Sequence, residues 1–352
     1  MIRIIVLVLA LDIFITDSLV LADVLLAPAV LLAWKKVHVS RKEILFFSAL
    51  LIVALYQYLF KEYWQPTNFI SNFVRVLFVF SVFKVLRESH NTQGMDKAFR
   101  FLWSVLAISF LIYLIYPSSS LYTVQSHGST RFTSIFYLEP AHFCLNFACV
   151  SLYVLERKIL PSWSIILSLI ILVLAKSFTG LILAVFFMIS YFSKRLLLLL
   201  IPTSILGLSQ VGYIMDRLIR ITEFTDMSSI HRTLGMLEGF VYLVNSRLFL
   251  GVGLGQINTF LLHERPEFNY WYSPVLFGFT NSGINNGLLY LFFSLGLVGV
   301  LIVVSVLRNI STKYVVFMIL YMFSISNIFD VAFVLPILIV SFLDRKKFLR
   351  GA

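Results

Sequence analysis

Continuous apolar runs separated by short polar connections dominate this chain. They predict membrane-spanning segments at about 3–16, 18–34, 44–60, 68–86, 98–116, 139–156, 162–175, 178–193, 196–212, 285–307, 313–327 and 329–343. A helix needs about 20 mostly apolar residues to cross a bilayer, whereas the strands of a membrane barrel alternate over about 10 residues. We therefore expect an all-α bundle of about 12 transmembrane helices, forming one integral membrane domain over residues 1–352. The runs on either side of Lys176-Ser177 are short, which predicts a kinked helix or re-entrant elements there.

The distribution of charge predicts how these segments are oriented. The net charge of +11, taken alone, would suggest a nucleic-acid partner. However, 19 of the 28 basic residues fall on every second connection, as the positive-inside rule requires when both termini are cytoplasmic. Topology therefore explains the basic balance, and we expect no nucleic-acid partner. The same side carries five acids: Glu43, Glu88, Asp96, Glu156 and Asp344.

The longest interval without a spanning run is 213–286, which this topology places on the outer face of the membrane. It contains five arginines, six acids and two histidines, His231 and His263. Within it, Ser228 to Phe249 reads as an amphipathic helix suited to the membrane interface. Arg232 would lie near the positive end of that helix, which is unfavourable unless an anion binds there too. We therefore expect the interval to form much of a site for a large anionic substrate.

Arg75 stands inside an apolar run, FISNFVRVLFVFSVF, several residues from either end. A charge at that depth is costly, so a site inside the membrane is one reading. The other is a side chain that reaches the interface or pairs with an acid such as Asp12 or Asp23. Both readings stay open at this point.

A second outer loop contains Arg131 and leads into Glu139, Pro140 and His142. Proline suits the first turn of a helix, and an acid there meets the positive end of the helix dipole. Glu139 is then either a helix-start carboxylate or a general base, with Arg131 as a phosphate clamp. His142 would share the helical face of Glu139.

Other polar motifs are less specific. The run from Gly251 to Gly255 follows no strand, so we expect a tight loop and not a dinucleotide site. Asn281 and Asn285 could satisfy a helix end or bind sugar hydroxyls. The sequence lacks GxxxxGK[ST], HExxH, CxxC and Asp-x-Asp motifs, and we expect neither a metal nor a cofactor.

Four stretches in order, RFTSIFYLEPAHF, LAKSFTG, HRTLGMLEGFVYLVNSRLFLGVGLG and NSGINNGLLYLFFSLGLVGVLI, resemble the bacterial O-antigen polymerase (Wzy) and O-antigen ligase superfamily. The resemblance implies a metal-independent C-type glycosyltransferase fold. It also implies a substrate, undecaprenyl-diphosphate-linked oligosaccharide repeats, joined on the outer face of the bacterial inner membrane in polysaccharide or lipopolysaccharide biosynthesis. A chain-length regulator in the same membrane is a further expected partner.

The resemblance assigns Arg131 and Arg232 to the diphosphate and Glu139 to the acid of an EP motif. Ligases carry a His-Asn pair before the helix that follows the long loop, but this chain has Ile284-Asn285-Asn286 there. The missing histidine favours a polymerase over a ligase. We expect Glu139 to be the base, with His231 and His263 as alternatives.

Two readings from other classes compete with the polymerase. Many helices and a charge inside the membrane would also suit a transporter or flippase of lipid-linked oligosaccharide, although no inverted repeat is evident. A scaffold without activity is the third reading, and it predicts that Arg131→Ala and Arg232→Ala are silent.

Overall fold

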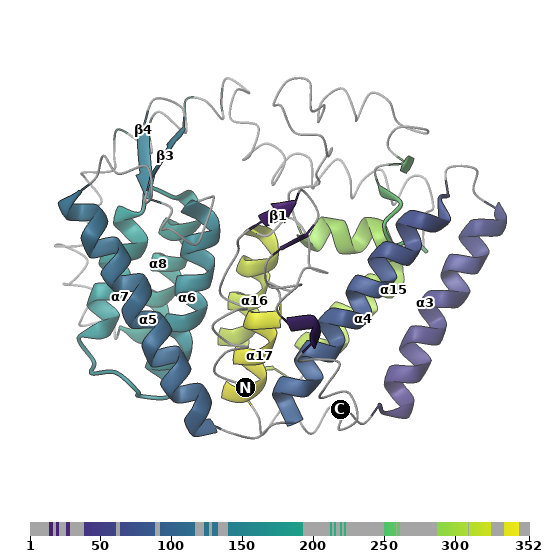
Figure 1. The fold of residues 1–352 in the computed structure, drawn as a ribbon, viewed down its shortest axis with the longest axis horizontal. Helices are drawn as coiled ribbons and strands as arrows, with labels where there is room; N and C mark the ends of the chain where they lie inside the picture. Colours follow the sequence, from purple (N-terminus) through teal and green to yellow (C-terminus); the bar gives the residue numbers. More distant parts are fainter. Residues whose placement is uncertain are drawn as a thin grey trace.

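The structure is a computed structural model of the whole chain. The residues it describes are 14–16, 19–20, 26–28, 39–60, 64–88, 92–116, 123–126, 129–132, 140–192, 212, 215, 219, 222, 250–257, 259–260, 287–308, 310–324 and 334–344. In this part of the chain, the fold is a bundle of helices with two short β-ribbons (Figure 1).

The helices coincide with predicted apolar segments. They are α3 (Arg41–Phe60), α4 (Pro66–Glu88), α5 (Thr92–Ile115), α6 (Pro140–Glu156), α7 (Ser164–Leu174), α8 (Phe178–Tyr191), α15 (Gly287–Leu307), α16 (Thr312–Ser324) and α17 (Val334–Leu343). Stretches of α3, α4, α5 and α15 are long and apolar enough to cross a membrane. The helical class of the prediction is therefore confirmed for these residues. The predicted segment 196–212 lies outside the described residues except at Gly212.

Sequence-encoded caps set where several helices begin. Ser40 and Glu43 form a reciprocal capping pair at the start of α3: the Ser40 amide donates to Glu43 Oε2 (2.7 Å) and the Glu43 amide to Ser40 Oγ (3.3 Å). Pro66 and Pro140 are the first residues of α4 and α6. At that position a backbone N–H would have no acceptor within the helix, so the N–H that proline lacks is not needed. The helix start predicted at Pro140 is thereby confirmed.

Two antiparallel ribbons differ from the prediction. β1 (Phe14–Thr16) pairs with β2 (Leu19–Val20), so the helices predicted over 3–16 and 18–34 are wrong for these residues. The β-branched and aromatic residues Phe14, Ile15 and Val20 favour strands. Between α5 and α6, in the loop predicted to be outer, β3 (Thr123–Ser126) pairs with β4 (Ser129–Phe132).

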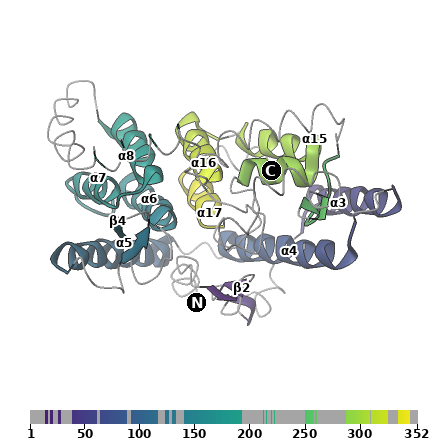
Figure 2. The ribbon, with the colours of Figure 1, turned by 90° about the horizontal axis from the view of Figure 1, so that it is seen from above.

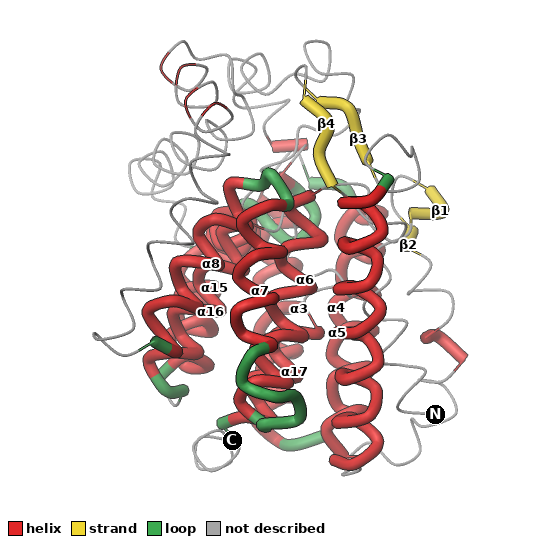
Figure 3. The backbone as a smooth tube through the Cα atoms, turned by 90° about the vertical axis from the view of Figure 1, so that its left-hand side faces the viewer, coloured by secondary structure: helices red, strands yellow, loops and turns green. Residues whose placement is uncertain are grey.

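The helices form two groups with a bridge between them. α5, α6, α7 and α8 pack together on one side, α3, α4 and α15 lie on the other, and α16 and α17 stand between (Figure 2). The bridge is in direct contact with both groups, because α17 packs against α4 and α6. The β3–β4 ribbon projects from one end of the bundle (Figure 3).

The outer faces of the helices are apolar, as a bilayer requires. Leu45, Ile52 and Phe60 of α3 are 69%, 68% and 67% exposed, and Ile189 of α8 is 78% exposed. A soluble domain rarely exposes a continuous apolar surface of this kind. We infer that lipid covers it.

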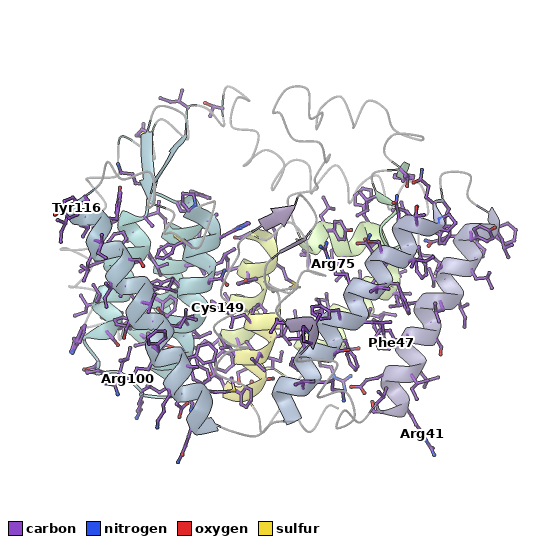
Figure 4. The ribbon with its side chains drawn as sticks, viewed as in Figure 1. Arg41, Phe47, Arg75, Arg100, Tyr116 and Cys149 are labelled. Carbon is purple, nitrogen blue, oxygen red and sulfur yellow. The ribbon has the colours of Figure 1, made fainter. Side chains whose placement is uncertain are left out.

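Acids and bases meet at one end of the bundle, the end that carries Arg41 and Arg100, opposite Tyr116 (Figure 4). The links there are Glu43–Lys84 (2.8 Å), Asp96–Arg157 (3.1 Å), Glu156–Lys313, and Asp344 accepting from the Ser311 amide (2.5 Å). Four of the five acids that the topology assigned to the basic side thus bond to a cation or backbone amide there. The hydrogen bonds that Arg157 donates to the Asp96 carboxylate also raise the pKa of Arg157, which stays charged.

Glu156 joins three helices at that end. It ends α6 and accepts hydrogen bonds from Tyr191 of α8 (2.6 Å), Tyr314 of α16 (3.0 Å) and Lys313 of α16. The Lys313 ammonium also lies 3.7 Å from the centre of the Tyr191 ring. Burial on its own raises the pKa of Glu156, but the bonds from Lys313 and the two tyrosines outweigh burial and lower it.

α7 and α8 form a helical hairpin that turns at Ala175–Ser177, with Lys176 at a φ of 53°. α7 has 11 residues, so it rises only about 16 Å, about half of a hydrocarbon core. The hydrogen bond from Tyr191 to Glu156 brings the end of α8 back to the end of α6. The hairpin is one of the two arrangements predicted around Lys176. It therefore begins and ends at the same end of the bundle.

We expect Lys313→Met to lower the stability of the detergent-solubilised protein by about 1–3 kcal/mol, because Glu156 loses its cation while remaining partly buried. The melting temperature measured by differential scanning fluorimetry should fall by about 2–6 °C. Lys158→Met, at an exposed lysine, is the matched control and should change nothing.

The effect of Lys313→Met should depend on pH. Since folding lowers the pKa of Glu156, its contribution is present at neutral pH and is lost as pH falls through that lowered pKa. The difference between wild type and Lys313→Met should therefore shrink in acid. A difference that stays constant down to full protonation of Glu156 would contradict the ion pair as its cause.

Candidate functional site

Three of the predicted site residues lie in the described part of the chain: Arg75, Arg131 and His142. The others fall outside it, and their roles remain predictions. They are Glu139, His231, Arg232, His263, Asn281 and Asn285.

Arg131 and His142 lie toward the same end of the bundle. Arg131 belongs to β4, opposite Val124 of β3, and the ribbon stands above the α5–α8 group (Figure 1). His142 is half-buried in the first turn of α6. Arg75 belongs to α4 in the other helix group, and α17 packs between α4 and α6. The described residues thus bring two of the predicted residues into one region, with the third across the bridge.

Arg75 lies well inside a helix and beside α15. It is half-buried at the tenth residue of α4, about 14 Å along the axis from Pro66. Figure 4 shows it next to the first part of α15. Asp12 and Asp23, the partners considered from the sequence, lie outside the described residues.

α15 is broken at Gly296, whose φ of 55° and ψ of −134° are not helical. The segment before the break lies across the bundle, while the segment after it continues toward α16 (Figures 1 and 2). Hydropathy and length alone would count α15 as one straight membrane span, but the break shows two segments. A break inside a membrane frees backbone carbonyls, which must find other donors.

Those donors come from a glycine-rich loop, residues 251–256, which we call the wedge loop. The Val252 amide donates to the Phe293 carbonyl (2.7 Å) and the Gly253 amide to the Ser294 carbonyl (3.1 Å). In an unbroken helix these carbonyls would accept from the amides four residues later. The wedge loop therefore completes the backbone hydrogen bonding of α15 at its break.

Glycine is required where the wedge loop touches its neighbours most closely. Gly251 has a φ of +71°, and a Cβ there would lie 2.6 Å from the Phe293 carbonyl oxygen. Gly255 has a φ of +75°, and a Cβ there would lie 2.5 Å from the Asn68 carbonyl oxygen of α4. At both positions the backbone has a left-handed conformation, and the nearest atom is a helix carbonyl that cannot move away.

Buried side-chain amides fasten the wedge loop to α3 and α4. Gln57 of α3, 1% exposed, donates from Nε2 to the Gly251 carbonyl (2.9 Å). Gln256, fully buried, donates from Nε2 to the Gln65 carbonyl (2.8 Å) and accepts from the Gln65 amide (2.9 Å). These two hydrogen bonds resemble the backbone pairing of adjacent β-strands, and they hold the chain just before α4.

Leu254 adds an apolar anchor to these bonds. Its side chain, 3% exposed, packs in a cluster with Ala54 of α3 and with Phe69 and Val76 of α4. The tight loop predicted for Gly251 to Gly255 is confirmed, but its insertion between three helices was missed. The available signal was the alternation of glycine with apolar residues, followed by a glutamine, inside an otherwise polar interval.

The site as described is a cation on α4 that lies next to α15, two helices that the wedge loop ties together. Among the described residues, no group of three or more His, Cys, Asp or Glu side chains could hold a metal ion. Comparisons of the chain with models of protein families, with characterised proteins and with solved structures find no match.

We expect Gly251→Ala to destabilise the protein by about 2–5 kcal/mol, through left-handed backbone strain and overpacking against α15. Fluorescence-detected size-exclusion chromatography in detergent should show a loss of monodisperse protein. Gly212→Ala is the control, because a Cβ at Gly212 meets nothing within 4 Å. Equal yield and melting temperature for the two variants would contradict the close approach of the loop to α15.

Proposed function

We propose that this protein is a glycosyltransferase of the Wzy type, which joins undecaprenyl-diphosphate-linked oligosaccharide repeats on the outer face of the bacterial inner membrane. The observation that carries the proposal is Arg75, a cation that lies about 14 Å along α4 from Pro66 and next to α15, inside an apolar bundle. A charge at such a depth marks a functional site by default. Arginine suits a phosphate group because its planar fork donates two parallel hydrogen bonds.

The chemistry requires cations for a leaving group and a base for an acceptor. An acceptor sugar hydroxyl gives its proton to the base, its oxygen bonds to the anomeric carbon of the donor repeat, and the bond from that carbon to the lipid diphosphate breaks. Arg75, Arg131 and Arg232 stabilise the negative charge that develops on the diphosphate. Glu139 is the proposed base, with His231 and His263 as alternatives.

The proposed orientation places the ion-paired end of the bundle in the cytoplasm. That end carries Arg41, Arg100 and the links of Glu43, Asp96 and Glu156. The β3–β4 ribbon with Arg131 then faces outward, where lipid-linked repeats are polymerised. Both termini are cytoplasmic in this proposal, and about 12 spans and the C-type glycosyltransferase fold belong to it as well. A chain-length regulator is the expected protein partner.

A transporter or flippase of lipid-linked oligosaccharide is the second candidate. Two interrupted elements favour it, namely the break of α15 at Gly296 and the α7–α8 hairpin. Broken helices and re-entrant segments often line the substrate site of a transporter. An O-antigen ligase is the third candidate, and the absence of histidine at Ile284-Asn285-Asn286 weighs against it.

Deleting the gene in its source bacterium separates these candidates. If the protein is the polymerase, gels of surface polysaccharide should show lipid carrying a single repeat, because transfer to the surface continues without polymerisation. Repeats missing from the surface altogether would overturn the polymerase and favour the flippase or the ligase. Complementation with the wild-type gene should restore the long chains.

Arg75→Ala should reduce polymer by about 10²–10³-fold in the complemented deletion strain, since a cation that stabilises the leaving group is lost. Arg75→Lys should retain part of the activity, because it keeps the charge without the bidentate fork. Arg100→Ala, at an exposed arginine on the other end of the bundle, is the control. Immunoblots must show equal membrane levels, and full-length polymer from Arg75→Ala would contradict the proposed role.

A further inference from the structure

Lys176 is a half-buried cation at the turn of the α7–α8 hairpin. The two other lysines with described, at least half-buried side chains each hold a carboxylate. Lys84 pairs with Glu43 at 2.8 Å, and Lys313 pairs with Glu156. The Lys176 side chain makes no ion pair with any side chain that the structure describes. Because a charge taken out of water is costly without a partner, Lys176 lacks the compensation that the other two lysines have.

The packing of the hairpin against α6 places Lys176 near the start of that helix. A Cβ at Gly180 of α8 would lie 2.8 Å from Cys144 Sγ, so α8 touches α6 there. Cys144 is only about 6 Å along α6 from Pro140. From this contact α8 runs toward Glu156, where its Tyr191 ends. Lys176 precedes Gly180, so it lies on the other side of the contact, toward the first turn of α6.

This position is far from the acids whose side chains the structure describes. Those acids lie at the opposite end of the bundle, and they are Glu43, Asp96, Glu156 and Asp344. Along α6, Cys144 and Glu156 are about 18 Å apart. That distance is more than half of a hydrocarbon core, which is about 30 Å thick. A lysine at such a depth marks a candidate functional site, as Arg75 does.

The other described features at this end favour an anion. α6 and α8 both begin here, and the N-terminus of a helix carries a partial positive charge. The residue before α8, Ser177, makes no side-chain hydrogen bond that caps the helix. His142 lies in the first turn of α6, and Arg131 belongs to the β3–β4 ribbon that projects from this end (Figure 3). The ligand that suits these groups together is an anion with several acceptor oxygens.

We propose that Lys176 binds a phosphate group carried by a lipid, at the end of the bundle where α6 begins. The lysine ammonium acts on phosphate as a point charge with three donors. A phosphate on a lipid fits because the lysine lies among apolar helices and not in solvent. Two kinds of lipid carry such a group, a polyprenyl diphosphate and a phospholipid of the bilayer. Only the choice of the first rests on the proposed function.

The first part of the test is stability without ligand. Lys176→Met removes a charge that has no described partner, so the melting temperature in detergent should stay within about 1 °C of wild type or rise. Lys313→Met, which breaks an ion pair, should lower it. A fall for Lys176→Met as large as that for Lys313→Met would overturn the inference, because Lys176 would then be a structural cation.

The second part measures lipid binding. The purified protein is titrated with undecaprenyl diphosphate and, in separate samples, with phosphatidylglycerol, and the rise in melting temperature is followed. We expect Lys176→Met to weaken the binding of undecaprenyl diphosphate about tenfold, since one charged hydrogen bond is lost. Lys176→Arg should retain most of the affinity, because it keeps the charge. Lys97→Met, at an exposed lysine of α5 near the other end, is the matched control.

The two lipids distinguish the source of the phosphate. A shift that depends on Lys176 and is as large with phosphatidylglycerol supports the phosphate site but contradicts its link to the proposed function. Equal affinity of wild type and Lys176→Met for both lipids would overturn the inference, since the lysine would then only reach toward the membrane surface. Absence of a shift with either lipid would overturn it too. No polymer is measured, so a failure here is distinct from a failure of the proposed enzyme activity.

Discussion

The need to pair every backbone amide and carbonyl away from water determines the centre of this structure. α15 breaks inside an apolar environment, and the carbonyls of Phe293 and Ser294 would be left unsatisfied there. Residues some forty positions earlier supply the missing donors. The glycines of the wedge loop, the buried glutamines and the bent path of α15 all contribute to this hydrogen bonding between the loop and α15. Removing any one of them would leave a polar group without a partner in a medium that offers none.

Charge is distributed differently at one end of the bundle and within it. At the end that carries Arg41 and Arg100, acids neutralise neighbouring bases and link helices to one another, as Glu156 links α6, α8 and α16. Arg75, by contrast, lies within the helices, next to α15. The first arrangement stabilises the protein, whereas a charge at the second position is costly in an apolar medium.

The sequence predicted the features that depend on local pattern. Continuous apolar runs located α3 to α8 and α15 to α17, and Pro140 marked the start of α6. Arg75 was identified because a charge in an apolar run is conspicuous. The partners of the wedge loop were missed, because pairings such as Gln65 with Gln256 join residues 191 positions apart. No local pattern encodes such a distance, and neutral amides leave no trace in hydropathy.

The α7–α8 hairpin bears on how the chain is threaded through the bilayer during synthesis. It begins beside Arg157 and Lys158 and ends where Tyr191 meets Glu156, so it starts and finishes at the same face. A hairpin of this kind does not change the side of the membrane from which the next helix starts. Every later helix keeps its direction whether the two helices insert early, late or together. The hairpin could therefore enter the bundle after its neighbours are in place, filling the space against α6 without reorienting the rest.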